Sequence, residues 1–357
     1  MQAHLSRCCF VASIVLALST AARFRARAQM SPPLVGLIGG EIPSLNQIRP
    51  VLGVLGASSI QAPIEMSREI SGVYLAPTGG WALVERGGRA PGVGALSAGR
   101  PSAPAGRNGS LADQLGLVAF KGSQPGAIQA IAGAVPNPGL ISFSPLGRSA
   151  ALLASSAVIQ VLTGLDSTPQ VAFEVNFQDP SGVHKMAVSD DGQLLTVLSA
   201  AGEVYLLPNS IAPVLACAAS PSSGIAFLPN QSTAVIADAG SGTMNLASLV
   251  KGAPMVRTFA AGVSSSGGET LVETSLDGAS AFVVVTGSAS AWRVEVANGS
   301  LQSVALPAPV TRLDRLRDGE SFVFSAQPGR SAWFLTGRGS GLQAVFAAAS
   351  TTGVSGQ

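Results

Sequence analysis

Histidine and cysteine are scarce in this chain, and charged and aromatic residues are sparse. The 357 residues include two histidines and three cysteines, and only 11% are charged and 5% aromatic. Beyond the first 28 residues, which have the pattern of an export signal, only His184 and Cys217 remain. A Ser-His-acid triad therefore has a single imidazole available, zinc and copper sites lack most of their usual ligands, and an intramolecular disulfide is excluded.

This shortage decides how the two remaining side chains are interpreted. His184, in "PSGVHKMAVS", lies at the approach to a predicted inner strand and is interpreted as an ordinary hydrogen-bonding residue. Cys217 has apolar neighbours in "PVLACAASPS" and is interpreted as a small buried thiol. The sequence has no Gly-x-Ser-x-Gly elbow, and no Gly-rich run precedes a Lys-Ser/Thr pair. We therefore predict no catalytic, cofactor-binding or metal-ligating residues.

The N-terminus has the pattern of a secretory signal peptide. Arg7 precedes an apolar run over residues 8–22, and Ala26-Arg27-Ala28 places small residues before a cleavage site. The run is shorter than the roughly 20 apolar residues that span a bilayer. We expect residues 1–28 to be removed and the protein to be exported, to the periplasm or outside the cell. Cleavage near Ala22, or an uncleaved anchor, is the alternative.

The charge balance gives no reason to expect a polyanionic partner. The chain has 21 Lys and Arg against 19 Asp and Glu, but four arginines and no acids lie within residues 1–28, which leaves 17 against 19, a net charge of −2. Nucleic acid and anionic membranes are therefore not expected to bind. We expect a monomer without stable membrane insertion once the signal is removed.

A repeated strand–turn–strand pattern runs through the rest of the chain. "SDDGQLLTVLSAAGEVYLL" (189–207) recurs in outline from Gly139, Gly224, Leu271 and Leu313, and a shorter copy begins at Gly72. The turns begin at residues 144, 189, 228, 275 and 316, spaced by 45, 39, 47 and 41 residues. A period of 40–50 residues with four short strands is typical of a β-propeller blade. We predict an all-β propeller with six four-stranded antiparallel blades, and a seven-bladed ring as the alternative.

The segments outside the repeats complete this organisation. We predict one propeller domain over residues 29–348, interrupted by a flexible Gly/Pro/Ala-rich insert at 87–110 and followed by a disordered tail at 349–357. Two strands expected within residues 32–56 would complete a blade begun near the C-terminus. Asn298-Gly299 predicts a type I′ hairpin turn.

The turns "SDDG" (189–192) and "SLDG" (275–278) resemble those of bacterial YVTN- and TolB-type propeller repeats. The resemblance extends over most of residues 72–347 and implies the propeller fold, with a binding or scaffold role. The WD-repeat pattern is absent, since no unit carries a Gly-His or Trp-Asp pair.

Carboxylates are the remaining candidates for chemistry. None recurs in a calcium-loop spacing, and Asp191, Asp277 and Asp318 are each followed by Gly, which predicts turns. Asp190 has no acidic counterpart in the other repeats and is the better functional candidate. The other acids considered are Asp166, Glu174, Asp179, Asp238, Glu269, Glu273, Asp314 and Glu320.

Two further residue types are interpreted as structural. Trp81, Trp292 and Trp333 fall in corresponding strands of different repeats and are expected to pack between blades. Three Asn-x-Ser/Thr sequons begin at residues 108, 230 and 298, and such short motifs arise often by chance.

The sequence leads to three functional hypotheses. The first is an exported binding or scaffold module without catalytic machinery, whose protein or small-molecule ligand binds one propeller face. The second is a lactonase-like propeller hydrolase that uses carboxylates and a divalent cation. The third is an envelope protein that senses a small ligand in the channel. The sequence does not identify the ligand.

Overall fold

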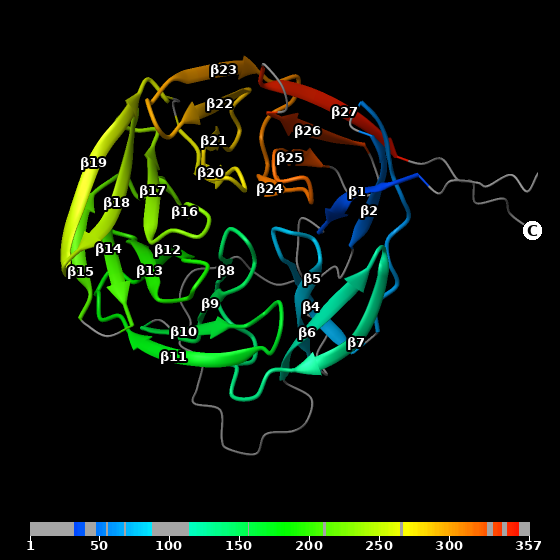
Figure 1. Cartoon of the computed structure of the whole chain (residues 1–357), viewed down its shortest axis with the longest axis horizontal. Coiled ribbons are helices and arrows are strands. Elements are labelled where there is room, and N and C mark those ends of the chain that lie inside the picture. Colours follow the sequence, from blue (N-terminus) through cyan, green and yellow to red (C-terminus); the bar gives the residue numbers. More distant parts are fainter. Residues whose placement is uncertain are drawn as a thin grey trace, which may run out of the picture. The chain divides into compact units, whose positions relative to one another are not determined.

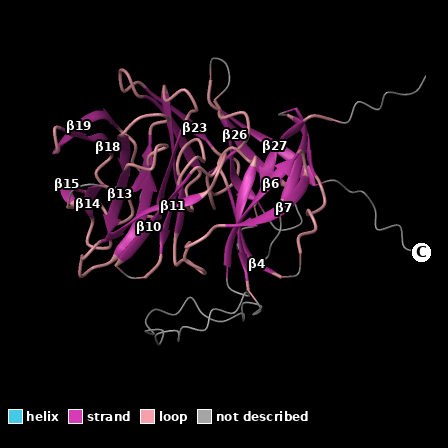
Figure 2. Cartoon of the chain, turned by 60° about the horizontal axis from the view of Figure 1, so that its bottom comes forward, coloured by secondary structure: helices cyan, strands magenta, loops and turns pink. Residues whose placement is uncertain are grey.

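The computed structural model describes residues 32–39, 48–54, 56–67, 69–87, 114–155, 157–209, 212–264, 267–326, 331–337 and 341–349. These residues form 27 strands, with turns and loops but no helix (Figure 2). No stretch of them is therefore a helix with the length and apolar character needed to cross a membrane. The described residues from Leu34 onward cluster as one compact unit. The predicted signal peptide, the insert beyond Gly87 and the tail beyond residue 349 lie outside the described residues.

Five sheets contain four consecutive antiparallel strands each, and we number them blades I to V. Blade I comprises β4 (Ile70–Leu75), β5 (Trp81–Arg86), β6 (Gln114–Lys121) and β7 (Gln124–Ala130). Blade II comprises β8 (Ile141–Phe143), β9 (Ala150–Leu153), β10 (Val158–Thr163) and β11 (Gln170–Asn176). Blade III comprises β12 (Val183–Val188), β13 (Leu194–Ser199), β14 (Glu203–Pro208) and β15 (Val214–Ala218). Blade IV comprises β16 (Gly224–Phe227), β17 (Thr233–Asp238), β18 (Thr243–Val250) and β19 (Ala253–Ala261). Blade V comprises β20 (Thr270–Thr274), β21 (Ser280–Val285), β22 (Ser290–Glu295) and β23 (Leu301–Ala305).

A mixed seven-stranded sheet joins the two ends of this unit. Its C-terminal half, blade VI, comprises β24 (Asp314–Arg315), β25 (Ser321–Ala326), β26 (Ala332–Thr336) and β27 (Gln343–Ala349). Its N-terminal half comprises β1 (Leu34–Ile38), β2 (Arg49–Val54) and β3 (Ala57–Ile60). The halves meet where β27 pairs in parallel with β3, through Ala348–Ser59 and Ala349–Ile60. The N-terminal strands thus share a sheet with the C-terminal ones, as predicted, and β3 is an additional strand.

The sheets form the ring of a β-propeller, with the first strand of each repeat nearest its centre (Figure 1). The described residues form seven clusters of buried apolar side chains, six between neighbouring sheets and one between the two halves of the mixed sheet. Strands β1–β3 pack against blade I on one side and blade VI on the other. Counting the mixed sheet once gives six blades, and counting its halves separately gives seven; the separate clusters favour the second count.

The six predicted hairpins between first and second strands are all present, and one local hydrogen bond closes each turn. The N–H of the fourth turn residue donates to the carbonyl of the first over 2.8 to 3.2 Å. In the turn of blade III, for example, the N–H of Gly192 donates to the carbonyl of Ser189 over 2.9 Å, with Gly192 at φ +68°. A side chain rarely adopts this left-handed conformation, which explains the recurring glycine.

Two details of the sequence predictions have clear outcomes. The three tryptophans pack between blades as expected: Trp81 stacks edge-on against Phe143 of blade II, Trp292 lies in the cluster between blades IV and V, and Trp333 packs against the cluster between blades V and VI. The prediction of a type I′ turn at Asn298-Gly299 is wrong. Only Gly299 has a positive φ, +70°, because a four-residue loop spans the Glu295–Ser300 pair, which needs one left-handed residue instead of two.

Candidate functional site

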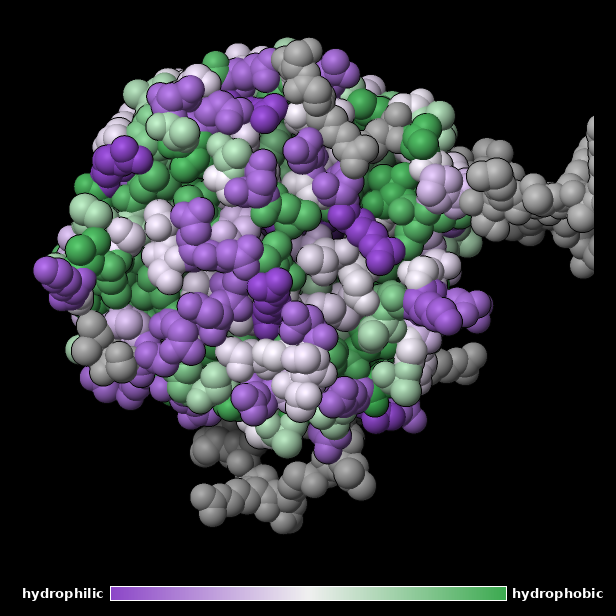
Figure 3. All heavy atoms as spheres, in the orientation of Figure 1, coloured by the Kyte–Doolittle hydropathy of each residue, from purple (hydrophilic) through white to green (hydrophobic). Residues whose placement is uncertain are grey.

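The innermost strands enclose two adjoining cavities at the centre of the ring. The Tyr74 cavity, of about 340 Å³, is lined mainly by β4, β8 and β24. The His184 cavity, of about 420 Å³, is lined mainly by β8, β12, β16 and β20. Both share a set of lining residues, Ile141, Ser142, Glu273, Arg312 and Asp314. Hydrophilic residues gather around the middle of the face seen in Figure 3, with hydrophobic ones between them.

Lys185 on β12 ties three blades together at the His184 cavity. Its Nζ donates to the carbonyl oxygens of Ser223 at 2.8 Å, Thr270 at 3.2 Å and Ser222 at 3.4 Å. It also forms an ion pair with the carboxylate of Glu269. Because an ammonium group has three hydrogens to donate, this arrangement uses its full capacity.

His184 lies beside the same carboxylate. Its Nε2 is 3.4 Å from Oε1 of Glu269, and its side chain lines the cavity, at the approach to an inner strand as expected. Burial acts to raise the pKa of Glu269, but the hydrogen bond and charge of Lys185, with a smaller contribution from His184, hold that pKa below its ordinary value. Glu269 is therefore a carboxylate in the neutral pH range.

Arg315 on β24 is the most deeply buried charge of the centre. Its Nη2 donates to Oε2 of Glu273 on β20 at 2.6 Å, and its Nη1 donates to the carbonyl of Pro145 at 2.6 Å. These contacts join blade VI to blade V and to the first turn of blade II. Burial raises the pKa of Glu273 above its ordinary value, and the Arg315 guanidinium opposes that rise.

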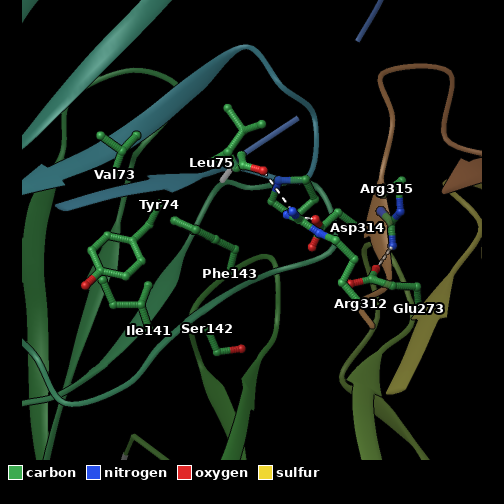
Figure 4. A pocket seen from close by; sticks show the side chains of 13 residues that line it. Val73, Tyr74, Leu75, Ile141, Ser142, Phe143, Glu273, Arg312, Asp314 and Arg315 are labelled. Atoms are coloured by element: carbon green, nitrogen blue, oxygen red, sulfur yellow. Dashed lines mark hydrogen bonds and ion pairs between the residues drawn. The ribbon is translucent and has the colours of Figure 1, made fainter. Parts of the chain in front are cut away.

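A third pair lies at the start of β24. Arg312 forms an ion pair with Asp314 and donates from Nη1 to the carbonyl of Gly39 at 2.8 Å. Figure 4 shows Arg312, Asp314, Glu273 and Arg315 gathered on one side of the Tyr74 cavity, with Val73, Tyr74 and Phe143 across from them.

In all three pairs the acid is more exposed than the base. The side chains of Glu269, Asp314 and Glu273 are 43%, 43% and 27% exposed, and those of their partners Lys185, Arg312 and Arg315 are 22%, 16% and 1% exposed. We call the three acids the channel carboxylates and the three bases the channel bases. The bases bond to backbone carbonyls within the protein, so Glu273 and Asp314, which line both cavities, provide most of the charge that a molecule in them would meet. Glu269 lines neither cavity and acts on the His184 cavity through His184 and Lys185.

Asp190, the acid that the sequence singled out, lies away from these cavities, in the first turn of blade III. It is buried, its Oδ1 accepts the N–H of Leu146 in blade II at 2.7 Å, and its Oδ2 accepts the N–H of Asn230 in blade IV at 2.7 Å. The carboxylate therefore connects the first turns of three consecutive blades. Both oxygens are occupied by backbone donors, which indicates a structural role.

The Asp-Gly turns behave as predicted. Oδ1 of Asp191 accepts the hydroxyl of Ser189 at 2.6 Å, and Oδ1 of Asp277 accepts the hydroxyl of Ser275 at 2.6 Å. Asp318 accepts the N–H of Ser321 at 2.9 Å. Each aspartate thus bonds within its own turn, which accounts for its recurrence without any chemistry on a ligand.

The remaining candidates do not join the central site. Among the described residues, no three His, Cys, Asp or Glu side chains lie close enough together to hold a metal ion. Asp166 pairs with Arg148, Glu174 accepts from Gln160, and Asp238 accepts the N–H of Gly240 in a turn. Cys217 is half-buried on the outer strand β15, where burial raises the pKa of its thiol.

Sequence reasoning named the channel carboxylates only within a long series of acids and did not single out the channel bases. A signal for them exists. In a chain with 11% charged residues, Lys185, Arg312 and Arg315 all fall within four residues before a predicted first turn, where the only other charged residues of the repeats are Glu273 and Asp314. Aligning the repeats on their turns and looking for charges in the first strand would have found them.

Comparison with known proteins bears on the fold. No family model matches the sequence, and no curated protein matches it significantly. A functionally unknown protein from Desulfotomaculum acetoxidans has a similar structure, with a TM-score of 0.56 and 12% identity over 89% of this chain and 99% of that chain. Hydrazine synthase from Kuenenia stuttgartiensis gives a TM-score of 0.47 and 10% identity, over 88% and 95% of the two chains. The β-propeller domain of Cps50 (Swd1) from Myceliophteria thermophila gives 0.43 and 13%, over 58% and 70%. Such identities concern the fold alone.

Proposed function

We propose that the protein is an exported β-propeller binding module without catalytic machinery, which holds its ligand at the centre of the ring. The observation that carries this proposal is the pair of adjoining cavities, whose polar lining is held in place by ion pairs between blades. A concave site with a few fixed polar groups among apolar side chains is typical of ligand binding. The ligand is either a small molecule or a side chain of a partner protein.

The cation-dependent hydrolase hypothesis has less support. A divalent cation needs six to eight oxygen ligands, several of them free carboxylates. Each channel carboxylate is already paired with a channel base, and no three His, Cys, Asp or Glu side chains of the described residues lie close enough together to ligate one ion. The binding proposal uses the same residues without removing those pairs.

Export and ancestry are parts of the same proposal. The signal-like N-terminus supports transport to the periplasm or the outside of a bacterial cell, and the Ser-x-Asp-Gly turns support kinship with YVTN- and TolB-type repeat proteins. Cell fractionation tests the first part: mature protein that begins near residue 29 is expected outside the cytoplasm. Full-length protein recovered from the cytoplasm would contradict export.

The binding proposal is tested with ligand-observed NMR on the full chain and four small probes of similar size. We choose n-butylammonium, butyrate, n-butanol and phenol, which present a cation, an anion, a neutral hydroxyl and an aromatic ring. At least one probe is expected to bind the natural protein. Its signal should disappear in Leu140→Trp, because Leu140 is an exposed residue at the His184 cavity and an indole there would block access.

A second blocking variant protects the test against misfolding. Ser142 lines both cavities, so Ser142→Trp is expected to have the same effect. Phe346, exposed on the outer strand β27, supplies the control: Phe346→Trp should leave binding unchanged. If no probe binds, or if binding survives both cavity variants, the proposal that the centre of the ring holds the ligand is wrong.

A further inference from the structure

We propose that the central site recognises an alkylammonium group, either of a free amine or of a lysine side chain on a partner. This inference rests on the proposed function and adds the chemical class of the ligand. It follows from which hydrogen-bonding groups of the site are already occupied and which remain available toward the cavities.

The channel bases have little capacity left for an anionic ligand. Lys185 is surrounded by three backbone carbonyls and Glu269. Arg315 is almost fully buried between Glu273 and Pro145, and its Nε, which has no partner among the described residues, is buried with it and not presented to a ligand. A carboxylate or phosphate entering the cavity would have to displace these acceptors. The site is therefore poorly suited to anions.

The channel carboxylates retain capacity. A carboxylate offers about four lone-pair positions on its two oxygens. Arg315 contacts Oε2 of Glu273, and Arg312 contacts Oδ2 of Asp314, so one oxygen of each acid is engaged by its base. These two side chains line both cavities and are partly exposed. Their remaining lone pairs can accept hydrogen bonds from a positively charged donor group on a ligand. Each carboxylate would then contact both its channel base and the ligand.

A buried hydroxyl at the wall of the same cavity supports a hydrogen-bonding ligand. Thr270 lines the His184 cavity and is only 1% exposed, yet its Oγ1 has no hydrogen-bond partner among the described residues. Leaving such a group unpaired costs free energy, and native proteins rarely do so. Because a hydroxyl accepts as well as donates, an ammonium group that reaches Thr270 would supply the missing hydrogen bond, and the preference for a cation rests on the carboxylates.

Apolar residues at the same cavity account for the alkyl part of the ligand. Leu140 is exposed there, and Ile225, Leu271 and Leu313 also line the wall. A flexible methylene stem can pack along such a surface while its charged head reaches polar partners. The combination favours an amine on a short alkyl chain over a metal ion, which has no apolar part.

The experiment compares three probes with the same four-carbon stem by NMR titration of the full chain. We expect n-butylammonium to bind at least fivefold more tightly than n-butanol, with butyrate weakest. Raising the ionic strength should weaken the binding of butylammonium and leave that of butanol unchanged. A tripeptide, acetyl-glycyl-lysyl-glycinamide, tests the second source: tighter binding than butylammonium points to a partner protein, and weaker binding points to a free amine.

Substitutions locate the binding group. Asp314→Asn and Glu273→Gln are each expected to weaken butylammonium binding at least fivefold, without changing the affinity for butanol, because both side chains line the two cavities. Two variants are used so that one remains informative if the other fails to fold, and thermal unfolding identifies such a failure. Glu295→Gln is the matched control, because Glu295 pairs with Arg293 on β22 outside both cavities; its affinity should stay within twofold of the natural protein.

The outcomes distinguish a wrong ligand class from a failure of the proposed binding function. If butyrate or butanol binds at the centre and butylammonium does not bind more tightly, the site binds a ligand but the ligand class is wrong. Equal affinity for butylammonium in the natural protein and both acid variants would also overturn the inference. If no probe binds, the proposed function itself fails.

Discussion

Asp190 and Asp314 are both aspartates in or next to a first strand of the ring, yet their surroundings differ in kind. Asp190 is buried in the first turn of blade III, and each of its oxygens accepts a backbone N–H from a neighbouring blade. Asp314 lies at the start of β24 beside two cavities, with one oxygen against Arg312 and its side chain partly exposed. Asp190 uses both oxygens to accept backbone N–H groups of the fold, whereas Asp314 can still accept hydrogen bonds from a ligand.

This comparison shows why isolation in the sequence is a weak guide to function. Asp190 stood out because the equivalent positions hold Leu276 and Arg317. The structure explains its singularity by two long-range hydrogen bonds that join three turns. Whether a polar group is structural or available for binding depends on whether its partners are already present, which only spatial neighbours decide.

The largest expected effect comes from the base most completely buried at the centre. Arg315→Met would leave the carboxylate of Glu273 without its cation and the carbonyl of Pro145 without its donor. Removing one partner of a buried ion pair costs about 3–5 kcal/mol. Urea unfolding should therefore show a loss of that size. A loss below that of Arg86→Met, whose exposed ion pair with Glu69 contributes little, would contradict the structural role of Arg315.

The next largest effect is expected at Asp190, the carboxylate that links three first turns. Asp190→Ala removes the acceptor for two backbone N–H groups in different blades, and each donor left unsatisfied costs about 1–3 kcal/mol. We expect a loss of about 2–6 kcal/mol in the free energy of unfolding. Asp191→Ala, the neighbouring turn residue that bonds only locally, should lose about 1 kcal/mol. Equal losses in the two variants would remove the distinction between them.

A smaller loss of stability is expected from a pair of glycine substitutions that test the contact between the first turns of blades V and VI. Gly319 (φ +79°) and Gly287 (φ +77°) both have a left-handed backbone, but a Cβ on Gly319 would lie 2.3 Å from Cδ1 of Leu276, whereas none of the described residues lies within 4 Å of a Cβ on Gly287. Gly287→Ala should cost about 1 kcal/mol for the backbone alone. Gly319→Ala is expected to cost about 1–3 kcal/mol more, as overpacking does. Chemical unfolding of both variants measures the difference.

The smallest effect is in the pH dependence of stability. The folded pKa of Glu269 is lowered, so this group stabilises the protein above its ordinary pKa of 4.5, and the contribution is lost as the pH falls toward its folded pKa. Burial raises the folded pKa of Glu85, although the hydrogen bond from Tyr74 opposes it, so Glu85 stabilises the protein below pH 4.5 and loses that contribution as the pH rises through its folded pKa.

Two variants distinguish the opposite contributions of Glu269 and Glu85 to the pH dependence of stability. Glu269→Gln should make stability rise less steeply between pH 3 and pH 4.5, by less than about 1 kcal/mol, because the group is partly exposed and screened. Glu85→Gln should remove a decline in stability above pH 4.5. Urea unfolding across pH 3–6.5 gives both slopes. If both variants changed the pH dependence of stability in the same direction, the opposite pKa shifts of Glu269 and Glu85 would be contradicted.

Much of the candidate site lay beyond prediction because its contacts join distant residues. The position of His184 at an inner strand followed from the repeat pattern. Its neighbour Glu269 is 85 positions away, and the Arg315–Pro145 hydrogen bond spans 170 positions. No local pattern carries such information, because it depends on how many sheets the ring contains and which strand edges face the centre.

The repeating unit of this protein can be read from its residues alone: four short strands and a first turn closed by one hydrogen bond. In three of these turns an Asp-Gly pair supplies a hydrogen-bond acceptor and a left-handed residue. These features depend on backbone geometry over a few residues, so local residue choice is sufficient to encode them. Long-range packing alone sets three other features: β1–β3 close the ring beside blade VI, Asp190 links three turns, and Glu273 and Asp314 line two cavities. Those outcomes depend on the packing of whole blades, which sets the distance between groups that the chain keeps far apart.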